Sequence, residues 1–239
     1  MSSFYHFNAT NLLRKLFKFE NPLFYMKIGV LGSGVVGQTL AIGLLKLGHE
    51  VCIGTRDSGK LKEWLGKAGN NASTGSFAEA ASFGEIAIIA TSWMGTENAI
   101  KMAGKKNFSG KIVIDVTNPL KFEKEGNPPS FAVAYPNSAG SLIQRWLPDA
   151  KVVKAFNIVL AHYMTNPKLQ EGSPDLFIAG NDENAKNKVK EIAVAFGWKD
   201  VYDLGDIQQA YLVESLAMIM IRYGILNNHW MHSWKLLKK

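Results

Sequence analysis

The chain alternates short apolar runs with longer stretches in which apolar residues recur every three or four positions. The run 27–32 (KIGVLG) is typical of a buried strand, and 35–48 (VVGQTLAIGLLKLG) has helical spacing and ends at a glycine. A second apolar run follows at 50–55 (EVCIGT). This order of strand, helix and strand predicts a βαβ unit.

The same alternation continues as far as residue 156. Apolar runs at 86–91 (IAIIAT), 111–117 (KIVIDVT) and 151–156 (KVVKAF) predict three more strands, separated by the helical candidates SFAEAASFG, GTENAIKMAG and SAGSLIQRWLP. Strands that alternate with helices favour a parallel sheet, because each crossover must carry the chain back over one face. The expected fold class is therefore α/β, a doubly wound parallel sheet.

After residue 156 the rhythm changes. Strands are predicted at LFIAG and DVYDL, on either side of a helix that Asn181 or Asp182 would cap. The stretch 206–226 predicts a long helix, apolar on most of its circumference, that packs on the sheet or on a second subunit. The tail NHWMHSWKLLKK predicts a last helix. We expect a nucleotide-binding domain at 26–156 and a small C-terminal α/β lobe at 157–239, which would supply the acceptor pocket and dimer contacts.

The first 25 residues are expected to be an extension outside this fold. They are rich in aromatic residues, and Arg14, Lys15 and Lys18 interrupt the apolar run that a secretory signal would need. Met26 stands directly before the first strand and would make a natural start. A transit-like amphipathic segment is the alternative.

Composition excludes several classes of protein. The formal net charge is +7, but the excess of basic residues lies mainly at the two ends of the chain, so we expect no nucleic-acid partner. No apolar run approaches the ~20 residues of a membrane-spanning helix, so we expect no membrane partner either. The single cysteine, Cys52, fits a reducing compartment, and the cytoplasm is the expected location.

Three glycines carry the first functional signal. Gly32, Gly34 and Gly37 in GSGVVG form a GxGxxG pattern between the first strand and its helix, inside a βαβ unit. The first glycine permits a tight turn, the second lets the backbone approach a pyrophosphate, and the third lets the helix pack on the strand. This context predicts dinucleotide binding at the start of the helix, where free N–H groups favour anions.

Residues after the second strand indicate which dinucleotide binds. In an NAD site an acidic residue here accepts hydrogen bonds from the ribose, and it would repel a 2′-phosphate. This chain instead has Thr55, Arg56 and, one helical turn on, Lys60, which together predict a clamp for the 2′-phosphate of NADP. Asp57 is the open alternative, since it could act as the ribose acid or cap the next helix.

The ends of the next two strands supply small polar side chains. Ligands of open α/β sheets bind at the carboxyl ends of strands, so Thr91, Ser92 and Trp93 in ATSW, and Asn118 and Pro119 in DVTNP, are expected near the nicotinamide. Each of them could equally be a loop residue that contacts no ligand.

Neither a hydrolytic arrangement nor a metal site is expected. His49 follows a glycine that ends a helix and is expected to be structural, while His162 has no convincing network. His229 and His232 have a spacing that a metal could use, but no carboxylate or cysteine stands near them. The neighbouring Trp230 and Trp234 suggest packing or a subunit contact. Glu214 could be a buried acid of mechanistic use, or a cap or surface ion pair.

Several motifs in order resemble the F420-dependent NADP reductase family, whose nucleotide domain is also similar to the cytosolic domain of STEAP metalloreductases. They are MKIGVLGSGVVGQTLAIGLLKLGHEVCIGTRD, ATSW, DVTNP, SAGSLIQRWLPDAKVVKAFN, FIAGND and LVESLAMIMIRYG. The resemblance implies a Rossmann domain with a small C-terminal lobe, often a homodimer. It also implies hydride transfer between NADP(H) and a deazaflavin, coenzyme F420.

The resemblance also implies roles for individual residues. Ser33, Val35 and Val36 would cover the pyrophosphate together with Gly34, and the stretch 155–157, with Ala155 and Asn157, would lie near the nicotinamide. Direct hydride transfer needs orientation more than a side-chain acid, so Ser92, Trp93, Asn118 and Asn157 are expected to position the reactants rather than to react.

Two functions follow from these expectations. The first is an NADPH-dependent oxidoreductase that uses F420, a flavin or another small-molecule acceptor. The second is a non-catalytic NADPH-binding sensor. An open space framed by Trp93, Asn118 and Asn157 would favour the enzyme, and a Trp93 ring that fills the space would favour the sensor.

Overall fold

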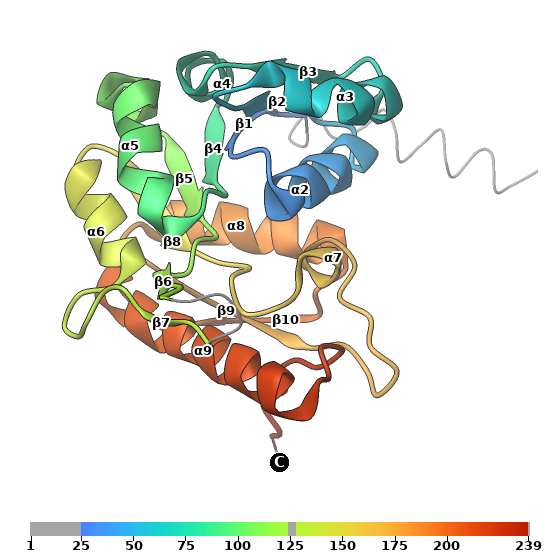
Figure 1. Ribbon diagram of the computed structural model, residues 1–239, viewed down its shortest axis with the longest axis vertical. Coiled ribbons are helices and arrows are strands. Elements are labelled where there is room, and N and C mark those ends of the chain that lie inside the picture. Colours follow the sequence, from blue (N-terminus) through green and yellow to red (C-terminus); the bar gives the residue numbers. More distant parts are fainter. Residues whose placement is uncertain (1–24, 124–127, 239) are drawn as a thin grey trace, which may run out of the picture.

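The computed structural model describes residues 25–123 and 128–238, so the expected N-terminal extension, apart from Tyr25, lies outside the described residues. Eight strands form one sheet in the order β10-β9-β8-β5-β4-β1-β2-β3, in which only the β8 and β9 pair is antiparallel (Figure 1). The strands are β1 Lys27–Leu31, β2 Glu50–Gly54, β3 Ala72–Gly75, β4 Ile86–Ile89, β5 Ile112–Asp115, β8 Lys151–Lys154, β9 Asp175–Gly180 and β10 Asp200–Asp203.

Helices cover both faces of the sheet, and a short antiparallel hairpin stands apart from it (Figure 1). The helices are α2 Val35–Lys46, α3 Lys62–Ala68, α4 Phe77–Phe83, α5 Trp93–Ala103, α6 Ala139–Trp146, α7 Ala161–Met164, α8 Glu183–Phe196 and α9 Ala210–Asn227. Three short 3₁₀ helices are η1 Ser58–Leu61, η2 Lys105–Phe108 and η3 Ile207–Gln209, and the hairpin pairs β6 Leu120–Lys121 with β7 Ser130–Phe131.

The central strands are apolar at nearly every position because both of their faces are buried. In β4, Ile86 and Ile88 pack in the hydrophobic core beneath α2, α7 and α8, while Ala87 and Ile89 pack in a second core with α4, α5 and α6. Continuous apolar runs are typical of parallel strands covered on both sides. The expected fold class, a Rossmann-type α/β sheet, is confirmed.

The segment after residue 156 extends this sheet. Strands β9 and β10 were expected and are present, and Asp182 caps α8 by accepting a hydrogen bond from the backbone N–H of Ala185 at 2.8 Å. Because β9 runs antiparallel to β8, its first residue lies beyond the carboxyl end of β8. This end of the sheet therefore carries residues from both halves of the chain.

The expected long helix is present as α9, but the expected last helix is wrong. Helix α9 ends where Asn228 adopts a left-handed conformation with φ of 47°, and the tail beyond it is extended. Tertiary contacts hold the tail: Lys235 forms ion pairs with Asp175 and Asp200, and the backbone N–H of Asp175 donates to the carbonyl of Trp234. These contacts fix an extended chain that helical spacing alone did not reveal.

Within residues 25–123 and 128–238, none of the helices is long and apolar enough to cross a bilayer.

Candidate functional site

The polar residues predicted from the strand ends line up along one edge of the sheet. From β2 across β1, β4 and β5 to β8, polar side chains within three residues of the strand ends belong to Thr55, Ser33, Thr91, Asn118 and Asn157. The strands are neighbours in this order, so the residues form a row. An extended ligand that lies along the edge would meet them one after another.

One part of the row forms a cavity of about 290 Å³. Eight of the residues predicted for the cofactor site line it: Gly32, Ser33, Gly34, Thr55, Arg56, Lys60, Thr91 and Ser92. The other predicted residues, which are Val35, Val36, Gly37, Trp93, Asn118, Pro119, Ala155 and Asn157, do not line this cavity. Sequence reasoning did not single out Phe77, Ala90, Gly95, Asn98 and Ala99, which complete its wall with Asp57.

The three glycines differ in what surrounds them. Gly32 has a φ of 125°, and a Cβ there would lie 2.4 Å from the carbonyl oxygen of Ala90. A Cβ on Gly37 would lie 2.0 Å from the carbonyl oxygen of Gly32, so the close packing of α2 on the turn requires glycine. A Cβ on Gly34 would meet nothing within 4 Å. The open space at Gly34 is what a bound pyrophosphate needs.

Hydrogen bonds fix the turn before any ligand arrives. The side-chain amide of Gln38 donates to the carbonyl oxygen of Ser33 at 2.8 Å, and the hydroxyl groups of Ser33 and Thr55 lie 3.1 Å apart. Helix α2 starts at Val35 with no side-chain cap on Gly34. The first N–H groups of this helix are therefore left for an anion.

The charges beside Thr55 are arranged as expected for an anion clamp. Arg56 and Lys60 are exposed, line the cavity and join no ion pair within the described part of the chain. Asp57 caps η1, because its carboxylate accepts the backbone N–H of Gly59 at 2.9 Å. Asp57 also lines the cavity, so the cap is present and the ribose role stays a prediction.

Trp93 points toward α6 rather than into this cavity. Its ring stacks on Trp146 with the centroids 5.6 Å apart and the planes inclined by 18°. Below it, the hydroxyl groups of Thr91 and Thr96 lie 2.8 Å apart, and Thr96 donates to the carbonyl oxygen of Ser92 at 3.1 Å. These contacts fix the start of α5 and leave the space beside Ser92 unfilled by the indole.

Asn118 and Asn157 form a reciprocal amide pair at the ends of β5 and β8. The Nδ2 group of Asn118 donates to the carbonyl oxygen of Asn157, and Nδ2 of Asn157 donates to Oδ1 of Asn118, both at 2.9 Å. Phe156, between the buried Ala155 and Asn157, has a φ of 62°, which is a strained conformation for an aromatic residue. Strain of this kind persists only where surrounding contacts enforce it.

A buried charge network lies beneath the amide pair. Lys154 Nζ lies 2.6 Å from Asp115 Oδ2 and 3.0 Å from Glu214 Oε1, and it donates to the carbonyl oxygen of Thr117 at 2.7 Å. Burial alone disfavours the ammonium ion, but the two carboxylates outweigh it and hold the pKa of Lys154 above its usual value. Glu214 is thus neither a surface pair nor a free acid.

Sequence reasoning missed this network except for Glu214. Asp115 and Lys154 each end a strand whose other residues are largely apolar. A charged residue in the last position of a buried strand is a signal that could have drawn attention to both, because an unpaired charge is not tolerated there.

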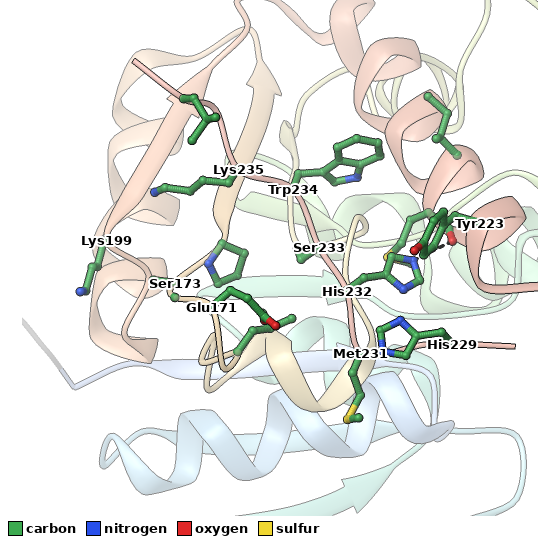
Figure 2. Close-up of a pocket in the computed structure, with 16 residues that line it drawn as sticks. Glu171, Ser173, Lys199, Tyr223, His229, Met231, His232, Ser233, Trp234 and Lys235 are labelled. Atoms are coloured by element: carbon green, nitrogen blue, oxygen red, sulfur yellow. Dashed lines mark hydrogen bonds between the residues drawn. The ribbon is translucent and has the colours of Figure 1, made fainter. Parts of the chain in front are cut away.

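A larger cavity, of about 790 Å³, lies between α9, the tail and the loop before β9 (Figure 2). His229 and His232 line it with ring centroids 5.8 Å apart, and a nitrogen of His232 lies 3.0 Å from the carbonyl oxygen of Met220. No group of three or more His, Cys, Asp or Glu residues that could hold a metal ion occurs in the described ranges. Trp230 packs against Gly224.

A doubly wound sheet with a glycine turn, free N–H groups at a helix start and cations after the second strand defines a nicotinamide-dinucleotide-binding protein of the Rossmann type. A family model described as NADP oxidoreductase, coenzyme F420-dependent, matches residues 27–119. The F420-dependent NADP reductase of Methanothermobacter marburgensis is 30% identical over 218 residues, which cover 84% of this chain and 94% of that protein. The chain belongs to the F420-dependent NADP reductase family and is an NADP-dependent oxidoreductase.

Two further relatives extend the comparison. The crystal structure of a putative F420-dependent NADP reductase from Arthrobacter sp. FB24 is 37% identical, has a TM-score of 0.84, and aligns over 89% of this chain and all of that one. The metalloreductase STEAP3 of Rattus norvegicus is 28% identical over 84% of this chain, but the match spans only 38% of the metalloreductase.

Proposed function

We propose that this enzyme transfers hydride between NADP(H) and a deazaflavin, coenzyme F420, or a similar flavin-like acceptor. The observation that carries the proposal is the cavity at the ends of β1, β2 and β4. It combines two cations, Arg56 and Lys60, that pair with no carboxylate of the described residues, with open backbone at Gly34. These groups suit a dinucleotide with an extra phosphate.

Residues along the row would hold successive parts of NADP(H). Arg56, Lys60 and Thr55 would bind the 2′-phosphate, and the backbone of 33–36 would bind the pyrophosphate. The nicotinamide would then reach the ends of β4, β5 and β8, near Ser92 and the pair of Asn118 and Asn157. NADPH bound in this way would supply a hydride and become NADP⁺, and the acceptor would take one further proton from solvent.

The side chains at this end position reactants rather than exchange protons. The amide pair is held by hydrogen bonds on both sides, and Ser92 stands at the exposed start of α5. Hydride transfer between two planar rings depends on closeness and orientation, which fixed amides can provide. The indole of Trp93 stacks on Trp146 and lies outside the cavity lining. Asn118 and Asn157 do not line the cavity either, so turnover is the measurement that separates the enzyme from the sensor.

The test is NADPH oxidation by the purified protein with coenzyme F420, beside free flavin as a second acceptor. We expect turnover with F420 and much slower turnover with free flavin. Tight NADPH binding without turnover on either acceptor would overturn the proposal and favour a sensor.

The predicted contact between Arg56 and the 2′-phosphate can be tested separately, with a matched control variant. Arg56→Ala removes a charge-assisted contact worth about 1.5–3 kcal/mol, so NADPH affinity should fall about 10- to 100-fold while NADH affinity stays near its starting value. Lys105→Ala, on η2 and outside the cavity lining, should change neither affinity. An equal loss for both dinucleotides in Arg56→Ala would contradict a 2′-phosphate contact.

We also propose that the protein forms a homodimer through exposed apolar residues of α9. Leu212, Ile219, Tyr223 and Leu226 are exposed at heptad-like spacing on this helix, and Ile219 and Tyr223 also line the larger cavity. A contiguous apolar face on a folded protein marks a contact surface, and one helix face can pair with itself about a two-fold axis. Sedimentation of Ile219→Asp should give monomers, whereas Val194→Asp, at an exposed position on α8, should sediment as the unaltered protein does.

A further inference from the structure

The buried charges below the amide pair meet because of strand register. Val113 and Val152 pack in the core beneath α5 and α6, and side chains two residues farther along a strand point to the same face. Asp115 and Lys154 therefore share this face, and they are register partners in the parallel β5 and β8 pair. Solvent reaches neither side chain, since both are 0% exposed.

The third charge comes from α9 and also anchors a helix. The carboxylate of Glu214, 2% exposed, accepts the backbone N–H groups of Ala139 and Gly140 at 3.0 and 3.1 Å, at the start of α6. A Cβ on Gly140 would lie 2.7 Å from Ala210, so glycine lets α6 approach α9 this closely. The network therefore joins two strands and two helices.

Three oxygen atoms surround the Lys154 ammonium group. Two belong to the carboxylates of Asp115 and Glu214, at ion-pair distances of 2.6 and 3.0 Å, and the third is the carbonyl oxygen of Thr117, to which Lys154 donates a hydrogen bond. Asp115 also accepts the N–H and hydroxyl groups of Thr117, at 2.8 and 2.7 Å. The two carboxylates alone compensate the charge of the ammonium group, so the bonds to Thr117 are not needed for that purpose. The bonds to Thr117 fix the residue directly before Asn118.

Helix α9 holds the amide pair from the other side. Nδ2 of Asn157 donates to the carbonyl oxygen of Val213 at 3.3 Å, and Val213 is the neighbour of Glu214. Oδ1 of Asn157 is buried and accepts no hydrogen bond from any described residue, so the amide is oriented through its Nδ2 group alone. The orientation of the pair thus depends on how firmly α9 and Thr117 are held.

We propose that Lys154 is a positioning residue for hydride transfer: its buried ammonium group fixes Thr117 and α9, and through them the Asn118 and Asn157 pair beside the nicotinamide. This inference rests on the proposed function, which places the nicotinamide at that pair. Lys154 touches neither reactant. Its effect is on the geometry with which the ring is held, not on the binding of the distant 2′-phosphate.

The chain offers a matched control in Lys186. Its side chain is only 4% exposed, and its ammonium nitrogen lies 2.6 Å from Glu183 Oε1 and 2.9 Å from Asp203 Oδ2. It belongs to α8, and its two ion-pair partners lie on α8 and β10 rather than in the loops after β5 and β8. Both substitutions remove a buried ammonium group that is paired with two carboxylates. Only Lys154 also donates a hydrogen bond to Thr117, so only its substitution releases that residue.

The experiment compares Lys154→Met with Lys186→Met in three measurements: kcat with F420, the NADPH dissociation constant, and the side-chain amide signals of Asn118 and Asn157 in NMR spectra of the NADP⁺ complex. We expect Lys154→Met to lower kcat about tenfold or more, to change the dissociation constant less than about threefold, and to shift or broaden both amide signals. Lys186→Met should leave the amide signals and kcat unchanged.

Equal effects of the two variants on kcat and on the amide signals would overturn the proposal, because they would reflect lost stability alone. Lys154→Met leaves two carboxylates buried; if it does not fold, Lys154→Met with Glu214→Gln restores the native net charge of the cluster and is measured in its place. The amide signals need no acceptor. If the unaltered protein does not turn over F420 or flavin, the proposed function fails while these signals still decide whether Lys154 orients the pair.

Discussion

Positive charge is used in opposite ways at the two ends of the row of polar residues. Beyond β2, Arg56 and Lys60 are exposed and line a cavity. In the last position of β8, Lys154 is fully buried and already bound to two carboxylates and a carbonyl group. An exposed, unpaired cation is available to a ligand, whereas a buried and paired one can act only through the groups that it holds.

The two ends also differ in what maintains their shape. The turn after β1 keeps its shape because its glycines have no side chains, which lets the backbone of α2 approach the turn. Beneath β5 and β8 the shape is kept by a set of buried charges, each of which depends on the others. The glycine turn should therefore be sensitive to added atoms, and the buried network to the removal of a charge.

The largest expected effect contrasts two alanine substitutions in the turn. Gly37→Ala would place a methyl group 2.0 Å from the carbonyl oxygen of Gly32, so the helix must shift, and we expect a loss of several kcal/mol in the free energy of unfolding. Gly34→Ala meets no protein atom within 4 Å and should fold normally, yet weaken NADPH about tenfold or more. Urea unfolding and NADPH titration of both variants separate these outcomes.

The next effect tests the buried charges. Glu214→Leu leaves the buried Lys154 with only one carboxylate partner and removes the acceptor at the start of α6. We therefore expect a loss of about 3–5 kcal/mol in the free energy of unfolding. Glu183→Leu removes a 73% exposed partner of the other buried lysine and should cost less than about 1 kcal/mol. If the two losses are similar, burial does not distinguish the networks.

A third, smaller effect concerns pH in the nucleotide-binding half. Burial lowers the pKa of His49, which lies between α2 and β2, below its ordinary value of 6.5. The unfolded chain then binds more protons than the folded one, so stability is full above pH 6.5 and falls as the pH drops below it, by at most about 1.4 kcal/mol per pH unit. Unfolding of the original chain and of His49→Gln between pH 7 and 5 should show a flatter profile in the variant.

The smallest effect is expected at the tail. The hydrogen bonds from Lys235 to Asp175 and Asp200 raise the pKa of its ammonium group, but this group is exposed and screened by salt. Lys235→Ala should lower the melting temperature only slightly, and less at high salt, while amide hydrogen exchange at 229–237 becomes faster. Unchanged exchange there would show that other contacts suffice to hold the tail.

Interactions between near neighbours made much of the fold readable from the chain. The glycine turn, the helix after it and the cations at Arg56 and Lys60 lie within 30 residues, so their spacing predicts how they meet. Strands buried on both faces appear as continuous apolar runs, which is why the doubly wound sheet could be expected. These parts of the structure follow from residues that are close together in the sequence, so they could be predicted from it.

Distant contacts explain what was missed. The expected helix in the tail was wrong because Asn228 ends α9 and because Asp175 and Asp200, far back in the chain, bind Lys235. The direction of Trp93 depended on Trp146, a residue of another helix. No spacing rule relates such partners, so only packing could place them.

By itself the sequence determined a glycine turn, an alternation of strands and helices, and cations that favour NADP, because each of these rests on backbone geometry or charge within a few residues. Only the tertiary structure decided that Asp115, Lys154 and Glu214 share one buried site and that Asn118 and Asn157 bond to each other. Register between strands and the approach of α9 bring these side chains together. A buried charge is stable only once such distant partners have met.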